Sequence, residues 1–565
     1  MNNPVSITPG IDAIDLHVRS YRSALKGTLE ITINSLSNSQ LKMRPILHPN
    51  GEDPQIFDTA AFVYSVFRLP EEIDRSRKVI VGQTPGVFKN AGFPNVDSWQ
   101  KIYTPGRRRT THFNPNSRIF ASFAASISDV DDLTNLLIAY QTEWNKLHTI
   151  LHSKYKTYLS LKKDLKNNHL LENINISTSD WQSFVKALGP KWPIRLKRIY
   201  KNILNLRIQL LAGSWVDYAK TTQKWWKNVA TTVSPKFHIS RQKIYFISSN
   251  THSIINLFTG FVLKNKNLIL DSLKKDLPEL YKYWDQIKNH QYFIDPNDFL
   301  YFASKFYLSL PEFNKDYLKY QEKLGVITIK SSHFLDINTQ IFPVKNLLKS
   351  PHLDNRLKIT KPSKLADSPA IIFNIDYPLG FAAYHVLSEI LENVNRINGV
   401  YILGKAAVLN SEVGDIQIPR MVFDEHTQNS YMFKNCFNSF FPFTNNQGSI
   451  LTNQKSVSVL GTFLENEALL QKYSENNLTV IEMESGPYLN AITEATYDQQ
   501  TPKNTIIDLN NAPFDVGIIN YASDTPYSKA KNLGNHHLRL DGAEPVYLGS
   551  LAILQRIINL EESTT

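Results

Sequence analysis

The sequence predicts an α/β protein, in which a mainly α-helical N-terminal domain precedes a mixed, mostly parallel sheet flanked by helices. From residue 370 onward, short apolar runs alternate with segments of helical periodicity, the pattern of parallel strands joined by helices. Before residue 322, apolar residues recur mainly at helical spacing. Because 565 residues are too many for one core, we expect an N-terminal segment (1–55), a mainly helical domain (56–322) and an α/β domain (323–565).

Composition limits the class of protein. Hydrophobic residues make up 42% and charged residues 20% of the chain, as in ordinary globular proteins. Cys436 is the only cysteine, which excludes an intrachain disulfide and fits a reducing compartment. The sequence has neither a secretory signal pattern nor an apolar run of about 18 residues. We therefore expect a cytoplasmic protein with no membrane partner.

The N-terminal half is basic in places, and each basic stretch has two interpretations. Residues 104–112 contain three consecutive arginines after a Pro-Gly turn, which could clamp a phosphate or pair with acidic residues of the same fold. Residues 180–230 mix tryptophans with basic residues, as in binders of single-stranded nucleic acid or in an amphipathic helix with a wet basic face. We favour the second interpretation in both cases and expect no nucleic-acid partner, although the net charge of +11 leaves an anionic ligand open.

Three further elements are predicted before residue 330. Apolar residues from Leu133 to Leu151 recur at helical spacing, and Ser128 and Asp129 are candidate N-caps of that helix. Residues 243–249 have the pattern of a strand, and a helix is expected to begin near Thr251.

The C-terminal half contains the clearest alternation of strands and helices. We expect strands at 370–375, 399–403, 414–419, 421–423, 456–460, 479–481 and 516–521, and helices at 381–394, 463–470 and 542–560. Two apolar runs end in acidic residues, Val480–Gly486 with Glu484 and Ile518–Thr525 with Asp524. Since ligands bind at the carboxyl ends of parallel strands, these two carboxylates are expected in one crevice.

The order and spacing of five segments resemble the nucleoside phosphorylase superfamily. Its nearest branch in layout is the methylthioadenosine/adenosylhomocysteine nucleosidases, with AMP nucleosidase a related possibility. The resemblance covers roughly residues 325–562. The segments are Asp376–Gly380, Gly404–Leu409, Gly414–Ile416, Met483–Ser485 and Ser523–Asp524.

The resemblance implies cleavage of the N-glycosidic bond of a purine nucleoside or nucleotide, by hydrolysis or phosphorolysis. Asp524 would supply or share the proton of the leaving base, Glu484 would bind the ribose hydroxyls, and Met483 would pack on the sugar. Phe463 matches a position where the family often stacks an aromatic ring on the base. No cofactor or metal is implied, phosphate is a possible co-substrate, and a homo-oligomer is expected. The remaining candidate substrate-binding residues are Gly404, Lys405, Ser523 and Tyr377.

The chain departs from the family pattern at three places. Ala407 and Val408 replace a pair of glycines, and Asp376 stands in a turn that often holds phosphate, where Lys405 could offset its charge. The early glutamate that activates water has no counterpart that we can locate. The first strand of the fold lies either at 325–330 or at 243–249, and in the second case Asn250 to Ser253 would face the site and the helical segment would be an insertion.

Two further inferences follow from these departures. Asp424, Glu425 and His426 are additional polar candidates for the rim of the site. The altered segments also keep open an alternative function, a non-catalytic protein that senses a nucleoside or nucleotide, or binds a partner, through a phosphorylase-like domain.

Overall fold

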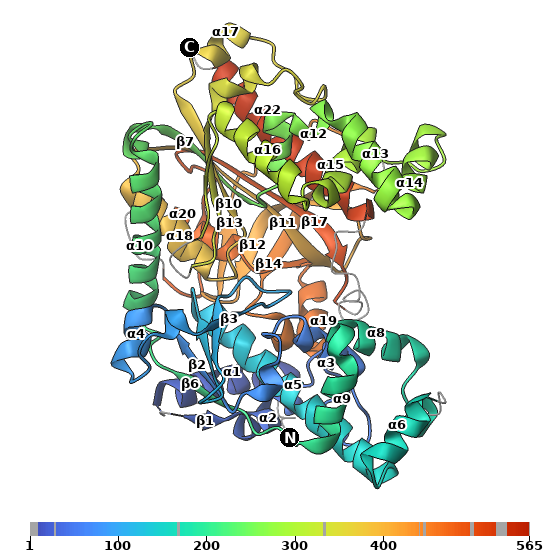
Figure 1. Ribbon diagram of the computed structural model, residues 1–565. Helices are drawn as coiled ribbons and strands as arrows, with labels where there is room; N and C mark the ends of the chain where they lie inside the picture. Colours follow the sequence, from blue (N-terminus) through green and yellow to red (C-terminus); the bar gives the residue numbers. More distant parts are fainter. Residues whose placement is uncertain are drawn as a thin grey trace.

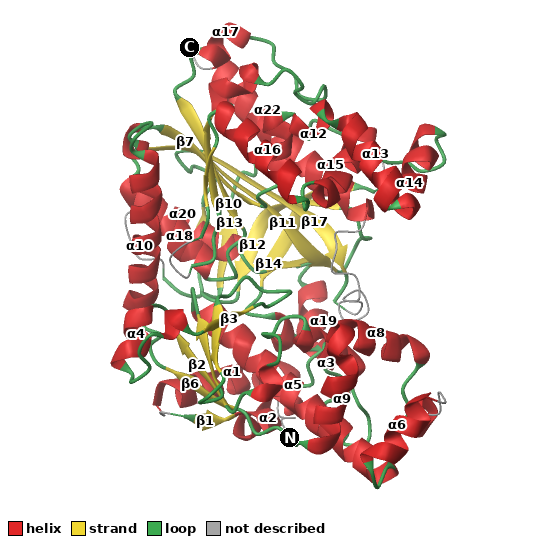
Figure 2. Cartoon of the chain, viewed as in Figure 1, coloured by secondary structure: helices red, strands yellow, loops and turns green. Residues whose placement is uncertain are grey.

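The computed structural model describes residues 9–27, 30–166, 170–331, 335–439, 441–444, 448–497, 502–526 and 540–563. Within these residues the chain forms two sheets, a small one in the lower part of the molecule and a large one near its centre (Figure 1). A six-stranded sheet A belongs to the N-terminal half, and an eleven-stranded sheet B contains the C-terminal strands. Helices cover both faces of sheet B (Figure 2).

Residues 56–322 are mainly helical, as expected, but they also supply five of the six strands of sheet A, which the sequence did not predict. Its strands are short, and a central parallel trio of β6, β2 and β5 is extended by antiparallel strands on both sides. The spatial order is β1 (Ile31–Thr32), β6 (Arg207–Leu210), β2 (Lys78–Gly82), β5 (Ile119–Phe123), β4 (Thr111–Asn114) and β3 (Gln100–Ile102).

Several helices of the N-terminal half pack against α5 (Ile127–Lys154), the long helix expected from its apolar stripe. Its N-cap is Ser126, whose hydroxyl accepts the Ser128 N–H at 3.2 Å, so the helix begins slightly before the predicted caps. The other helices are α1 (Pro9–Gly27), α2 (Ile33–Lys42), α3 (Thr59–Val66), α4 (Pro85–Asn90), α6 (Tyr158–Lys166), α7 (Leu170–Asn173), α8 (Thr178–Leu188), α9 (Trp192–Lys201) and α10 (Trp215–Val233). Helix α10 runs along one side of the molecule, from the level of sheet B down toward α4 (Figure 1).

Sheet B is mixed, and its central strands are parallel. Strand β7 (Lys243–Ser249) lies between β10 (Ala370–Asp376) and β11 (Arg396–Val408) and is parallel to both. Strand β11 continues in parallel to β17 (Asp515–Asp524). The other strands are β8 (Ile327–Ile329), β9 (Thr339–Pro343), β12 (Ile416–Asp424), β13 (Asn429–Met432), β14 (Ile450–Ser458), β15 (Val480–Glu482) and β16 (Ile506–Asp508).

The position of β7 decides between the two candidates for the first strand of the fold. Residues 243–249 form a central parallel strand, whereas residues 327–329 form an edge strand that pairs antiparallel with β9. Sheet B therefore includes a strand from before residue 323, the boundary expected from the sequence. The chain between β7 and β10 forms β8, β9 and the helices α11 (Ser253–Thr259), α12 (Phe261–Lys264), α13 (Lys266–Asp276), α14 (Pro278–Lys288), α15 (Pro296–Tyr307), α16 (Pro311–Lys323) and α17 (Pro362–Ala366).

Apolar clusters hold helices to each face of sheet B and join the two halves. One face carries α18 (Ala382–Asn393), α20 (Ser485–Tyr497) and α10, and the other carries α22 (Ala543–Ser563), α11 and α15. A third cluster begins among the N-terminal helices and continues into Val457, Phe463 and Ile481, and α19 (Glu467–Glu475) belongs to it. The two halves thus share this third cluster, while the clusters on the two faces of sheet B are separate from it.

Among the helices that the structure describes, none is long and apolar enough to cross a membrane.

Candidate functional site

A cavity of about 760 Å³ lies where the N-terminal half meets the carboxyl ends of the sheet B strands. The N-terminal half supplies α3, the loop 101–110 and the first turn of α5, and sheet B supplies the ends of β11, β15 and β17 with the turn after β10. Seven of the eight residues that the sequence predicted for the site line this cavity: Asp524, Glu484, Met483, Gly404, Lys405, Ser523 and Tyr377.

Phe463, the eighth predicted residue, does not line the cavity. Its ring is 3% exposed and meets the ring of Tyr64 edge-on, with 5.3 Å between the centroids. Tyr64 and Thr462 do line the cavity, and their hydroxyl oxygens are 2.7 Å apart. The aromatic ring at this wall therefore comes from Tyr64 in the N-terminal half, which no sequence pattern had indicated.

Glu484 reaches the cavity from the bend between β15 and α20, as the residue directly before the helix. The preceding acid, Glu482, caps this helix by accepting the N–H groups of Glu484 at 2.8 Å and Ser485 at 2.7 Å. The Glu484 carboxylate accepts the Gly380 N–H at 3.3 Å. Burial, and then the nearby charge of Glu482, raise the pKa of Glu484 to about 7. This carboxyl group therefore titrates near neutral pH.

Asp524 ends β17, where a buried apolar strand opens into the cavity. The Ser523 hydroxyl donates to the Asp524 carboxylate at 3.0 Å and lies 3.3 Å from the Ala406 carbonyl oxygen. The pairing of β17 with β11 shifts register between Ala406 and Ala407, so that Ala407 lies opposite Asp524. Such an irregularity redirects the side chains that follow it, and here it lies beside the predicted acid.

The segment that replaces the glycine pair continues β11 beyond this irregularity. Ala407 and Val408 are buried and pair with β15. At Gly404 an added Cβ would meet only the Asn520 side-chain oxygen, at 3.9 Å, which is an ordinary contact. Gly404 therefore leaves room in the cavity without being required by the backbone.

The three consecutive arginines of the loop after β3 pair with acidic residues of the same fold, as we favoured. Arg107 and Arg109 contact Asp132 at 2.6 and 2.7 Å, and Arg109 also contacts Asp129 at 3.0 Å. Although burial alone would raise it, these guanidinium groups hold the pKa of Asp132 well below its usual range. The loop is thus held rigidly over the cavity by buried ion pairs.

Arg108 neutralises the acid that the sequence placed in the turn after β10. It contacts Asp376 at 2.6 Å and also donates to the Tyr377 carbonyl oxygen. Asn338 donates to the same Asp376 carboxylate at 2.7 Å. The repulsion of phosphate expected from Asp376 is therefore offset by Arg108, whereas we had assigned that role to Lys405.

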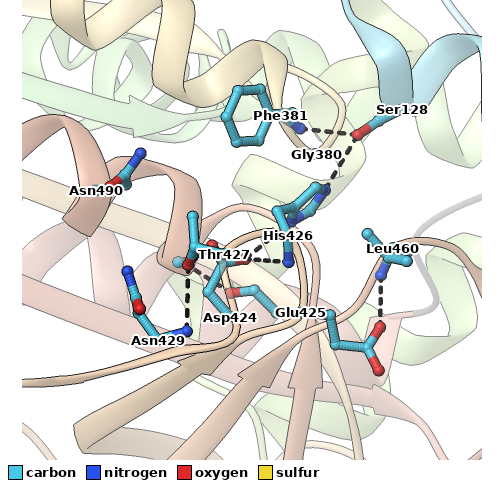
Figure 3. Close-up of polar contacts among 12 residues, drawn as sticks. Ser128, Gly380, Phe381, Asp424, Glu425, His426, Thr427, Asn429, Leu460 and Asn490 are labelled. Atoms are coloured by element: carbon cyan, nitrogen blue, oxygen red, sulfur yellow. Dashed lines mark hydrogen bonds and ion pairs between the residues drawn. The ribbon is translucent and has the colours of Figure 1, made fainter. Parts of the chain in front are cut away.

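Asp424, His426 and Ser128 form a relay that resembles a hydrolase triad (Figure 3). His426 Nδ1 lies 2.8 Å from Asp424 Oδ1, and His426 Nε2 lies 3.4 Å from Ser128 Oγ. Ser128 is fully buried, its hydroxyl accepts the Phe381 N–H at 2.9 Å, and it does not line the cavity. These contacts therefore fasten α5 to the turn after β10. Residues 424–426 do not line the cavity, contrary to the expectation that they lie at its rim.

Glu425, the neighbour of that relay, is also structural. Its carboxylate accepts the Leu460 N–H at 2.8 Å and the Tyr473 hydroxyl. Burial raises the pKa of Glu425 to about 7.

The end of β7 does not reach the cavity, contrary to the expectation for Asn250 to Ser253. The Asn250 side-chain oxygen accepts the N–H groups of His252 at 2.9 Å and Ser253 at 2.6 Å, which caps α11. None of these residues is part of the cavity wall in the described chain.

Comparison with solved structures finds similarity to nucleosidases and phosphorylases over about half of the chain. S-adenosylhomocysteine nucleosidase from Streptococcus pyogenes, in complex with 5-methylthiotubericidin, is 10% identical over 56% of this chain and 98% of its own, with a TM-score of 0.30. A methylthioadenosine/S-adenosylhomocysteine nucleosidase from S. pneumoniae is 12% identical over 44% and 96%, with a TM-score of 0.29. Isoform 2 of uridine phosphorylase from Schistosoma mansoni is 11% identical over 42% and 82%, with a TM-score of 0.26.

No curated protein matches the chain. One family model matches residues 33–559, which includes nearly all of both halves and every residue of the cavity wall named above. The chain therefore belongs to the family of unknown function DUF6909.

Proposed function

We propose that this protein cleaves the N-glycosidic bond of a purine nucleoside or nucleotide, by hydrolysis or phosphorolysis. The observation that carries the proposal is the convergence of Glu484 and Asp524 on one cavity, together with Met483, from two strands that are distant in sequence. The cavity volume of about 760 Å³ lies within the range of small-molecule sites.

The chemistry requires a proton at the leaving base and an oxygen nucleophile at the sugar. The bond between C1′ and the base nitrogen breaks, and an oxygen of water or orthophosphate bonds to C1′. Asp524 is suited to share the proton that the base takes up as it leaves, since general acids act from within hydrogen-bond reach. Glu484 is suited to accept hydrogen bonds from the ribose hydroxyls, because an ionised carboxylate offers only acceptors. This chemistry needs no further cofactor.

The test measures free base released from adenosine, inosine, AMP and methylthioadenosine, with and without phosphate. We expect release from at least one of them, and a fall of about 10²- to 10⁴-fold in Asp524→Asn. Asp271→Asn, an exposed carboxylate on α13, is the matched control and should keep full activity. Release from none of the four, or unchanged activity in Asp524→Asn, contradicts the proposal.

A second candidate is a protein that binds the nucleoside or nucleotide without turnover. It is favoured by the end of β7, where the Asn250 side chain bonds to backbone N–H groups at the start of α11 and residues 250–253 do not line the cavity. Stabilisation of the fold by a ligand that is not converted to product would support this function.

A further inference from the structure

The cations of the cavity wall differ in how they are paired. The three arginines of the loop after β3 each contact a carboxylate. Arg68 and Lys405 also line the cavity, one from the N-terminal half and one from β11. Within the part of the chain that the structure describes, neither forms an ion pair. Arg68 and Lys405, like the exposed Lys101 of the same wall, therefore face the cavity with no carboxylate of the described chain within ion-pair distance, although the charge of Asp524 acts on Arg68 and Lys405.

Arg68 is held in place but has unused donors. Its guanidinium carbon lies 3.6 Å from the centroid of the Tyr64 ring, and one N–H donates to the Tyr64 carbonyl oxygen over a long 3.4 Å. Its Nε is buried and has no hydrogen-bond partner. A buried N–H without an acceptor is costly. The side chain as a whole is only partly buried and lines the cavity, so its terminal N–H groups are the donors that a ligand can reach.

Lys405, the second cation, lines the cavity from β11. Its backbone lies opposite Tyr521 in the pairing of β11 with β17, three residues before Asp524. Its side chain is exposed on this wall. Withdrawal from bulk solvent, and then repulsion by Arg68, lower the pKa of Lys405, and Asp524 only partly compensates. The two cations therefore act on each other across the cavity.

We propose that Arg68 and Lys405 bind a phosphate group, so that the ligand of this cavity is phosphorylated; the nucleoside part of this ligand rests on the function proposed above. A guanidinium offers planar paired donors and an ammonium a compact charge, a combination suited to phosphate oxygens. The phosphate belongs either to a nucleoside monophosphate or to free orthophosphate as second reactant. Arg108 already neutralises Asp376, the acid that would otherwise repel it.

The first experiment measures binding in the full chain carrying Asp524→Asn, so that turnover does not interfere. Calorimetry compares AMP, adenosine and orthophosphate, first alone and then with Arg68→Met or Lys405→Met added. We expect either change to weaken binding of the phosphate-bearing ligand by about 10- to 100-fold, because each removes a charged hydrogen-bond donor. Binding of adenosine should change less than about threefold, within the scatter of a surface change.

Two controls keep the result interpretable. Lys89→Met removes an exposed charge from α4, outside the cavity, and should leave all three affinities unchanged. Arg68→Lys keeps a positive charge and should recover part of the affinity if Arg68→Met folds poorly. Lys405→Met provides a second variant that does not depend on the stacking of Arg68 on Tyr64.

The arms also separate the two sources of phosphate. Tighter binding of AMP than of adenosine identifies a nucleotide monoester, whereas binding of orthophosphate together with phosphate-dependent release of base from adenosine identifies a phosphorolytic second reactant. Equal losses for AMP and adenosine in Arg68→Met and Lys405→Met, or no preference for either phosphate-bearing ligand, overturn the proposal.

The outcome is distinguishable from failure of the proposed function. If no base is released but phosphate-dependent binding is lost in Arg68→Met, the proposed phosphate site is supported and the proposed cleavage is rejected. The opposite outcome is release of base from AMP and adenosine with equal efficiency and without phosphate, at rates that Arg68→Met leaves unchanged. In that case the proposed cleavage is supported and the proposed phosphate site is rejected.

Discussion

At the scale of single residues, the cavity combines two acids whose surroundings differ. Glu484 sits beside Glu482 in a buried turn, while Asp524 lies within the field of Arg68 and Lys405. Unequal environments of this kind let two carboxyl groups take different roles. In the proposed reaction, Glu484 orients the sugar and Asp524 handles the proton of the base.

The pKa of Glu484 leads to a prediction about pH. Burial and Glu482 raise this pKa to about 7, so the carboxyl is neutral in mild acid and accepts hydroxyl hydrogen bonds poorly. The kcat/KM for adenosine, which has no group titrating in this range, should fall by about tenfold per pH unit below 7. Glu484→Gln should lower kcat/KM at pH 8 and abolish this dependence on pH. A wild-type profile that is flat between pH 5 and 8 contradicts the assignment.

The raised pKa of Glu484 also affects the pH dependence of stability, and this effect can be measured without an activity assay. A carboxyl whose pKa is raised from 4.5 to about 7 in the folded state contributes stability that is present below pH 4.5 and lost as pH rises through 7. Glu484→Gln should therefore be at least as stable as the wild type at pH 8. Thermal unfolding at pH 5 and pH 8 measures the difference.

At the scale of elements, the turn after β10 depends on one glycine. Gly380 has a φ of +52°, and an added Cβ would lie 2.4 Å from Ser128 Oγ, the atom that links α5 to this turn. Gly380→Ala should destabilise the protein by about 1–3 kcal/mol and displace Tyr377 from the cavity wall. Urea unfolding measures the loss.

Gly404→Ala is the matched control, because its added Cβ makes only an ordinary contact and its φ is not in the left-handed region. Its stability should stay within about 0.5 kcal/mol of the wild type. Equal stability of the two variants would show that the turn tolerates a side chain at residue 380.

Prediction from sequence succeeded where a strand is an uninterrupted apolar run that ends in turn residues. The expected strand at 370–375 is β10, and the runs ending at Glu484 and Asp524 end at the cavity. Sheet A escaped prediction because its strands are only two to five residues long and its pairings join distant segments. Local periodicity carries no information about such pairings.

The same limit explains which site residues were missed. Tyr64 lies on α3 and Arg68 two residues after it, and nothing in the sequence of this apolar helix distinguishes them from ordinary core and surface residues. Only the packing of the N-terminal half onto sheet B turns them into cavity wall. Phe463 was wrongly predicted to line the cavity because the sequence does not show that Tyr64, from the N-terminal half, packs against its ring.

At the scale of the whole molecule, the shared core makes the two halves one structural unit. The apolar cluster that contains Tyr64, Trp144 and Leu147 also contains Val457 and Phe463. Because the cavity lies at this junction, its shape depends on both halves remaining packed. Loss of packing at the junction should therefore affect residues far from it in sequence.

Phe463→Ala tests this coupling directly. Phe463 is 3% exposed and holds the edge of Tyr64, so its truncation should cost about 3–5 kcal/mol. Because the cluster is continuous, hydrogen exchange should show α5 and β11 losing protection together, in one transition at a lower temperature than in the wild type. Phe293→Ala, at a ring that is 71% exposed, should leave that transition unchanged. If α5 stays protected while β11 opens, the halves unfold separately, and the cavity wall formed by Tyr64 and Arg68 is a docked surface rather than part of a common core.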